Sequence, residues 1–137
     1  MTSSELFDAF RSRLSSDASF SGGALRIDTS LGRLYVSDYK EKITLELAIS
    51  PEDFGFDFGQ CTRFDVIVNE YADKASLVCR ELKPLYPSLC IWLAEFEDIL
   101  VQWEGLPENL DELEEKIELV MEAVAKGREL MWRVIHA

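Results

Sequence analysis

The alternation of apolar and polar residues predicts a group of short strands in the first half of the chain. Three runs alternate in this way, Leu25–Ile27, Leu34–Val36 and Ile43–Ile49, and the last is the clearest. A period of two places successive side chains on opposite faces of a strand. Gly32 lies in the first turn, and residues 38–41 connect the second and third strands. We therefore expect an antiparallel meander with one face toward solvent.

Helical spacing predicts one helix before the meander and one near the end of the chain. Apolar residues from Leu6 to Leu14 recur at helical intervals behind a capping box at Thr2–Glu5, which predicts a short amphipathic helix over about residues 3–15. A long helix is expected from about residue 108 to 134. Its apolar residues recur at steps of three and four, and its acidic start and basic end suit the helix dipole.

The segment between the meander and the long helix predicts further strands. Residues 53–59 place three Phe among two Gly, which is typical of a loop, and residues 64–71 alternate as a strand does. Residues 75–83 fit a helix or a strand. Residues 89–94 and 99–104 alternate on either side of a short polar break, which predicts a tight hairpin in the centre of the sheet.

The order of these elements predicts the fold class. Strands that are grouped, and that do not alternate with helices, indicate an α+β fold. We expect a single domain over residues 1–137, in which an antiparallel sheet (meander plus later hairpin) is packed by the short N-terminal helix and the long C-terminal amphipathic helix.

Charge narrows the classes of partner. The chain has 26 acidic and 14 basic residues, for a net charge of −12. This balance argues against nucleic acid and anionic membrane surfaces, and suits a protein partner with a basic surface. No apolar run is long enough to span a membrane, and the first residues lack a secretory signal pattern. With an odd number of cysteines, three, we expect a cytoplasmic protein with reduced thiols.

Residues suited to catalysis are scarce. The one histidine, His136, is next to the last residue, so neither a catalytic triad nor a zinc site is expected. Asp53 and Asp57 lack the ligand pattern of a calcium loop, and no glycine-rich nucleotide motif is present. We expect no enzymatic activity, no cofactor and no metal. Cys79 and Cys90 fall in apolar runs and are expected to be buried.

Two segments are candidates for binding another protein. Phe54, Phe56 and Phe58 could form an adhesive loop, because aromatic residues are enriched at interfaces, or could fill the core under the sheet. The apolar stripe of the long helix could cover the sheet or pair in part with another subunit. Gly127 falls on this stripe and predicts a close backbone approach, since glycine inside a helix costs roughly 1 kcal/mol relative to alanine.

Taken together, the chain resembles the small acidic chaperones of bacterial type III secretion and the related YbjN-type fold. The resemblance rests on size, a pI of about 4.4 and four elements, which are the helix Glu5–Leu14, the meander Leu25–Ile49, the strand and turn Ile99–Pro107, and the long helix Asn109–Arg133. Such chaperones place a further helix between the meander and the later strands. The chain departs from them there, because residues 52–71 predict an aromatic loop and a strand.

The resemblance implies a function and its contacts. It implies a cytoplasmic homodimer without ATPase activity that holds an extended segment of a secreted effector in apolar grooves. Leu6, Phe7 and Phe10 on the first helix, with the meander strands, would contact that segment.

Two other functions are compatible with the sequence. An acidic immunity or antitoxin protein would inhibit a basic toxin by electrostatic complementarity, with acids of residues 95–98 and 104–118, among them Glu112 and Glu115, as the contacts. A small enzyme or ligand-binding domain would need a pocket that gathers several carboxylates. The hypothesis that the residues favour most is a non-catalytic protein-binding module.

Overall fold

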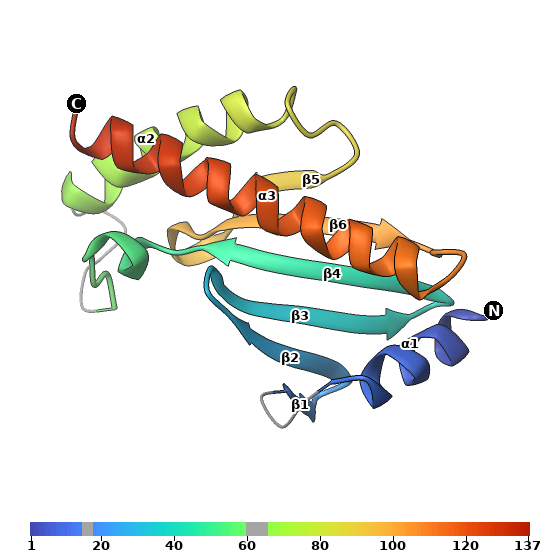
Figure 1. Cartoon of the computed structure of the whole chain (residues 1–137). Coiled ribbons are helices and arrows are strands. Elements are labelled where there is room, and N and C mark those ends of the chain that lie inside the picture. The colour runs from blue at the N-terminus through green and yellow to red at the C-terminus, as the bar shows by residue number, and fades with distance from the viewer. Residues whose placement is uncertain (15–17, 60–65) are drawn as a thin grey trace.

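A six-stranded antiparallel sheet forms the framework of the computed structural model, which describes residues 1–14, 18–59 and 66–137 (Figure 1). The strands are β1 (Ala18–Ser21), β2 (Ala24–Thr29), β3 (Gly32–Tyr39), β4 (Lys42–Ile49), β5 (Cys90–Leu93) and β6 (Ile99–Gly105). Their order in space is β1-β2-β3-β4-β6-β5, so the later hairpin joins the meander where β6 pairs with β4. The α+β class and the predicted sheet with its two flanking helices are confirmed.

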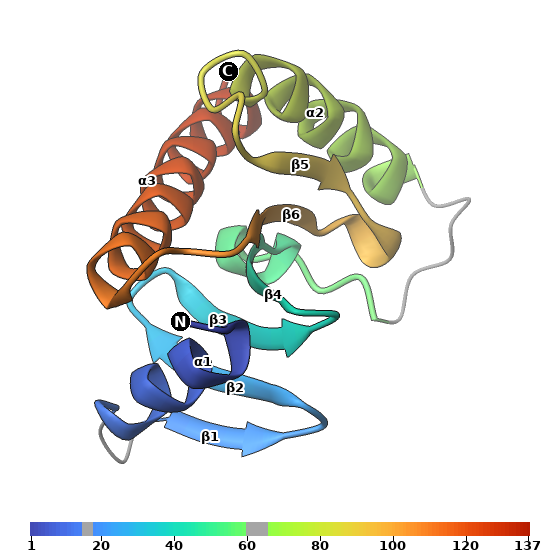
Figure 2. The same ribbon diagram turned by 90° about the vertical axis from the view of Figure 1, so that its right-hand side faces the viewer.

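Three helices cover one face of this sheet (Figure 2). They are α1 (Ser3–Ser12), α2 (Val66–Leu82) and α3 (Leu110–Ile135), and two short 3-10 helices are η1 (Pro51–Phe54) and η2 (Glu95–Glu97). The predicted capping box starts α1, because the backbone N–H of Glu5 donates to Thr2 Oγ1 at 3.2 Å and the Glu5 carboxylate accepts from the Thr2 N–H. The apolar stripe of α3 faces the sheet, so it contributes to the core.

Strand β4 shows how the sheet separates core from surface. Ile43, Leu45, Leu47 and Ile49 are fully buried beneath the helices, as the period-two pattern predicts. The residues between them point to the other side. On that side Arg26, Tyr35, Glu46 and Gln102 lie in register across four strands. We call the side that carries this row the open face, because α1, α2 and α3 pack on the opposite side.

The prediction of a strand at residues 64–71 is wrong, because residues 66–71 belong to helix α2. Residues 64 and 65 lie outside the described part of the chain. The alternation of Val66 and Val68 is a local coincidence at the start of a helix. Further along, the buried residues Val68, Tyr71, Ala75, Val78 and Leu82 recur at helical spacing. Residues 75–82, which fitted either a helix or a strand, are therefore helical. Helix α2 lies in the chain between the meander and the later hairpin.

Two further expectations about strands are corrected. Residues 18–21, where no strand was predicted, form the edge strand β1, in which Phe20 packs edge-to-face on Phe7 with ring centroids 6.1 Å apart. The later hairpin is neither tight nor wholly central. Residues 94–98 connect its strands, with positive φ at Phe96 and Glu97, and β5 is the other edge of the sheet. Strand pairing uses backbone groups, which leave little signal in the side-chain pattern.

Candidate functional site

The side chains predicted to line a groove on α1 are in the core. Leu6 is fully buried, and Phe7 and Phe10 each retain 6% exposure, all in contact with the cluster under the sheet. These three residues hold α1 against the sheet. In this conformation they are not part of the surface that a partner could reach.

The three Phe residues of the aromatic loop are half-buried and pack against the core. Phe56 and Phe58 each contact Tyr71 of α2 with ring centroids 5.4 Å apart, and Phe54 lies in η1. The loop is therefore anchored on α2 by an aromatic cluster. The Tyr71 hydroxyl is buried and has no hydrogen-bond partner among the described residues, and burial, with the Asp53 carboxylate adding to it, raises its pKa.

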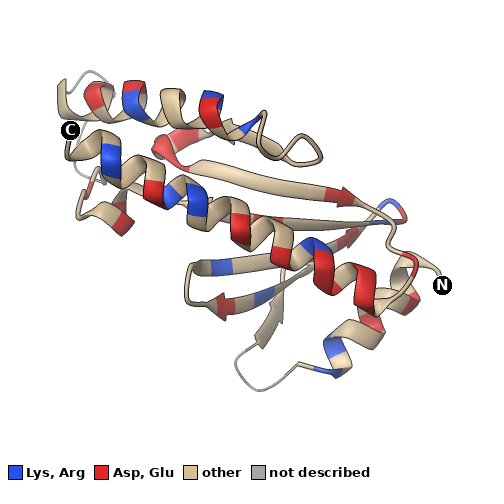
Figure 3. Ribbon diagram, turned by 45° about the horizontal axis from the view of Figure 1, so that its top comes forward, with Lys and Arg blue, Asp and Glu red and all other residues tan. Residues whose placement is uncertain are grey.

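The two predicted acidic contacts on α3 differ in their surroundings. Glu112 caps the helix: its carboxylate accepts from the Glu108 N–H at 2.8 Å, while its own N–H donates to Asn109 Oδ1 at 2.9 Å. Glu115 is exposed. Figure 3 shows that acids gather on the N-terminal half of α3 and that basic residues lie toward its C-terminal end. Glu115 thus belongs to an acidic surface, whereas Glu112 also stabilises the start of its helix.

A cavity of about 370 Å³ lies on the open face of the sheet. Three stretches of the chain build it: the β2–β3 turn with the first half of β3, the second half of β4 with the start of η1, and the start of β6. Its lining residues are Leu31, Gly32, Arg33, Tyr35, Glu46, Ala48, Ser50, Asp53, Asp98 and Leu100. We call this the open-face cavity. Sequence reasoning did not find it, because only strand register brings these segments together.

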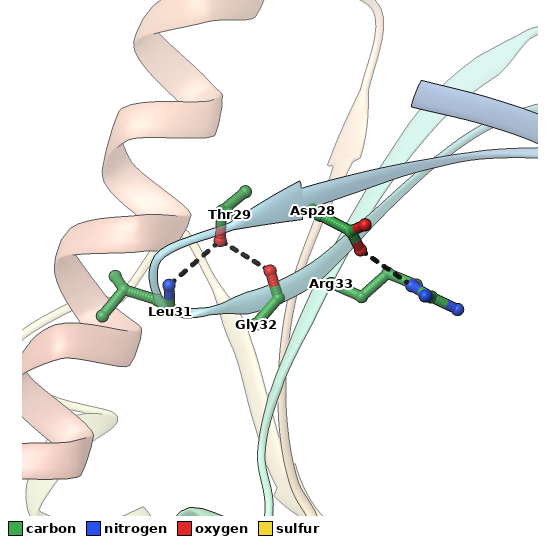
Figure 4. A network of polar contacts seen from close by, with 5 residues as sticks. All are labelled: Asp28, Thr29, Leu31, Gly32 and Arg33. Atoms are coloured by element: carbon green, nitrogen blue, oxygen red, sulfur yellow. Dashed lines mark hydrogen bonds and ion pairs between the residues drawn. The ribbon is translucent and has the colours of Figure 1, made fainter. Parts of the chain in front are cut away.

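Hydrogen bonds hold one rim of the cavity (Figure 4). Thr29 Oγ1 donates to the Gly32 carbonyl at 2.6 Å and accepts from the Leu31 N–H at 3.2 Å. Gly32 has a φ of +125°, which side-chain-bearing residues rarely adopt. On the same hairpin, Arg33 Nε donates to Asp28 Oδ1 at 3.1 Å. The turn is therefore fixed by its own residues, and the Arg33 charge is already paired.

Carboxylates dominate the remaining wall. Burial raises the pKa of Glu46 above its usual range. Burial also raises the pKa of Asp98, and the nearby carboxylates of Glu52 and Asp53 add to the shift, while a hydrogen bond from Ser50 opposes it. These shifts mean that the carboxylates are partly stripped of water without a matching positive charge. Their environment is one in which an added cation would be stabilised.

The two cysteines of the described chain differ in their exposure to solvent. Cys79 is buried, as predicted, and burial raises the pKa of its thiol. Cys90 is exposed on the edge strand β5, so the prediction that it is buried is wrong.

Within the described ranges, no three His, Cys, Asp or Glu residues converge as a metal site would require. None of the helices described here is both long and apolar enough to cross a membrane.

A second candidate surface consists of exposed apolar residues on α2 and η2. Leu77 is 40% exposed on α2, and Val66 and Ile67 at its start are more exposed still. Helix η2 contacts α2 and carries Phe96, whose side chain is 82% exposed. We call Val66, Ile67, Leu77 and Phe96 the α2-edge surface. Exposed apolar side chains on one helix and on the 3-10 helix that contacts it are candidates for a protein–protein contact.

Comparisons with protein-family models, with curated proteins and with solved structures each gave no match. Two surfaces of the molecule are therefore the candidates for a functional site. One is the open-face cavity, and the other is the α2-edge surface.

Proposed function

We propose that this chain is a non-catalytic, cytoplasmic protein-binding module that acts as a homodimer and holds an extended segment of another protein, as type III secretion chaperones do. The observation that carries the proposal is helix α2 between β4 and β5. It gives the order helix, meander, helix, hairpin and long helix, which is the order that the resemblance implies. Helix α2 stands where a strand was predicted, and its presence supports the proposal.

The α2-edge surface supports the homodimer. A twofold interface brings the same patch of two copies together, so an exposed apolar surface can cover itself. Leu77 and Phe96 would then lose their contact with water. Strand β5 ends the sheet beside this surface, and an unpaired strand edge is a second feature that association would satisfy.

The edge strand β1 supports binding of an extended segment. Among the described strands, β2 alone pairs with β1, and a peptide can pair with such an edge through backbone hydrogen bonds. Phe20 is 43% exposed there, with the Arg11 guanidinium 4.3 Å from the centre of its ring. A cavity of about 130 Å³ adjoins Phe20 and Leu25 and offers room for a side chain. These contacts replace the buried Leu6, Phe7 and Phe10 as the accessible part of the site.

An acidic immunity or antitoxin protein is the alternative function. The exposed acids along the first half of α3 favour it, because such a surface attracts a basic toxin over long range (Figure 3). The two functions differ in stoichiometry and in salt dependence. An immunity complex holds one copy of this chain and forms more slowly as salt rises, whereas strand addition in a dimer depends less on salt.

The test is affinity capture of the tagged chain from a lysate of its own source cells, followed by identification of the bound protein and light scattering of the complex. Two copies of the chain with one secreted protein would support the proposal. Leu77→Asp should then give a monomer, while Ser76→Asp, an exposed neighbour on the same helix, should leave the dimer intact. A one-to-one complex would favour the immunity protein, and an eluate without partner would contradict both functions.

A further inference from the structure

The open-face cavity combines features that recognise a particular kind of side chain. Its volume of about 370 Å³ falls within the range of ligand-binding clefts. Leu31, Ala48 and Leu100 supply apolar contacts, and Tyr35 supplies an aromatic ring. Glu46, Asp53 and Asp98 supply negative charge. An occupant would need an apolar stem and a positively charged end.

The charges of the cavity select a cation. Arg33 is the basic residue in the lining, and its charge is taken up by Asp28. Arg26 lies beside the cavity, opposite Tyr35 in the sheet register, with its guanidinium 5.9 Å from the centre of that ring. Within the described part of the chain, Glu46, Asp53 and Asp98 line the cavity and none of them forms an ion pair. An entering positive charge would replace part of the water that Glu46 and Asp98 have lost.

The arrangement of the carboxylates favours an organic cation over a metal ion. In the described chain, His, Cys, Asp and Glu side chains do not converge in groups of three that could ligate a metal. The carboxylates instead line the walls of a wider space, which an ammonium or guanidinium group on a flexible stem would fill. Cations of this kind also bind to the face of an aromatic ring such as Tyr35.

The position of the cavity relates it to the strand edge. Ala18 of β1 pairs with Ile27, and the adjacent Asp28 pairs with Arg33 at the cavity rim. The start of β1 and the cavity therefore lie at the same end of the sheet. A segment added along β1 can continue past the β2–β3 turn onto the open face.

We propose that the open-face cavity receives an arginine or lysine side chain of the bound protein segment. This assignment rests on the proposed function, in which the chain holds an extended segment, and it adds a chemical requirement for that segment. A segment with a basic residue beyond its strand-forming part would bind, and the same segment with a neutral residue there would bind more weakly.

The test uses a short blocked peptide, glycines flanking one arginine, titrated into isotopically labelled protein at physiological salt. A peptide with citrulline in place of arginine is the matched probe, because it has the same shape without the charge. We expect amide shifts centred on Tyr35, Glu46 and Leu100 for arginine, and an affinity at least about tenfold weaker for citrulline.

Variants separate the cavity from the general charge of the chain. Glu46→Gln with Asp98→Asn removes two negative charges from the cavity, and Glu81→Gln with Glu118→Gln removes two from exposed helix positions. We expect the first pair to weaken arginine binding about tenfold and the second to change it less than about twofold. Equal weakening by both pairs, or shifts spread along α3, would overturn the assignment.

Lysate capture with the cavity variant distinguishes the two proposals. Reduced capture of the partner by Glu46→Gln with Asp98→Asn would support the assignment. Undiminished capture would leave the protein-binding function standing and overturn the role of the cavity. If the chain binds the arginine peptide but captures no protein, the proposed function is contradicted. The claim that the bound side chain belongs to a protein segment is then contradicted as well.

Discussion

Gly127 of α3 lies directly against Ile49 at the end of β4, and Leu82 of α2 closes the same contact. A Cβ at position 127 would come 2.9 Å from Leu82 Cδ1 and closer still to Ile49 Cδ1. All three residues are buried, so neither side chain has free space to move into. The glycine is thus what lets two helices and a strand meet at one point. The close approach predicted from its place on the apolar stripe is confirmed.

Replacing Gly127 with alanine should destabilise the fold. The gain in helix propensity of roughly 1 kcal/mol is outweighed by overpacking of about 1–3 kcal/mol, so we expect a net loss of about 1 kcal/mol in the free energy of unfolding. Ile49→Val removes the closest methyl group. Denaturant unfolding of the double variant should show a loss smaller than the sum of the two single losses. Additive losses would mean that the contact is not the cause.

Phe7 and Phe20 should respond very differently to polar substitution, although they touch. Phe7→Asp places a carboxylate in the core and should cost about 4 kcal/mol or more, because it combines lost packing with burial of a charge. Phe20→Ser, at the half-exposed edge strand, should cost about 1 kcal/mol. Thermal unfolding measures both. Only Phe20→Ser can then test partner binding, and similar losses for the two variants would contradict the burial of α1.

Removing the Tyr71 hydroxyl should stabilise the protein. This hydroxyl is buried without a partner in the described structure, so Tyr71→Phe relieves a cost of about 1 kcal/mol and keeps the ring contacts with Phe56 and Phe58. Tyr86→Phe is the control, since the Tyr86 hydroxyl interacts with Glu122. Calorimetry should show a higher unfolding temperature for the first variant and not for the second. A lower temperature for Tyr71→Phe would mean that the hydroxyl has a partner after all.

Glu46 should make the protein less stable as pH rises. Burial raises its pKa in the folded state, so the folded state holds the proton more tightly than the unfolded state does. Stability is therefore lost from the ordinary glutamate pKa of about 4.3 upward through the folded value. Glu46→Gln should be more stable than the parent at pH 7, with an advantage that shrinks toward pH 4. Glu104→Gln, on an exposed part of the same face, is the control in urea titrations at each pH.

The meander and the long helix could be predicted from the sequence because a single rule decides each of them. The apolar residues of β4 repeat with period two and are all buried on one side of the sheet, so the same pattern predicts both the strand and its core face. These residues are Ile43, Leu45, Leu47 and Ile49. The start of α2 could not be predicted in this way. Val66 and Val68 suit a strand in isolation, and only packing of Tyr71 and Val78 into the core makes the segment helical.

The sequence alone determined the fold class, the two flanking helices and the core face of the meander, because these follow from local periodicity and the hydrophobic effect. It also determined the net charge and thus the kinds of partner to expect. Only the tertiary structure decided that Leu6 and Phe7 are covered, that β1 forms an edge, and that Glu46 and Asp98 face one cavity. These features depend on strand order and register, which bring together residues far apart in the chain and which no local pattern encodes.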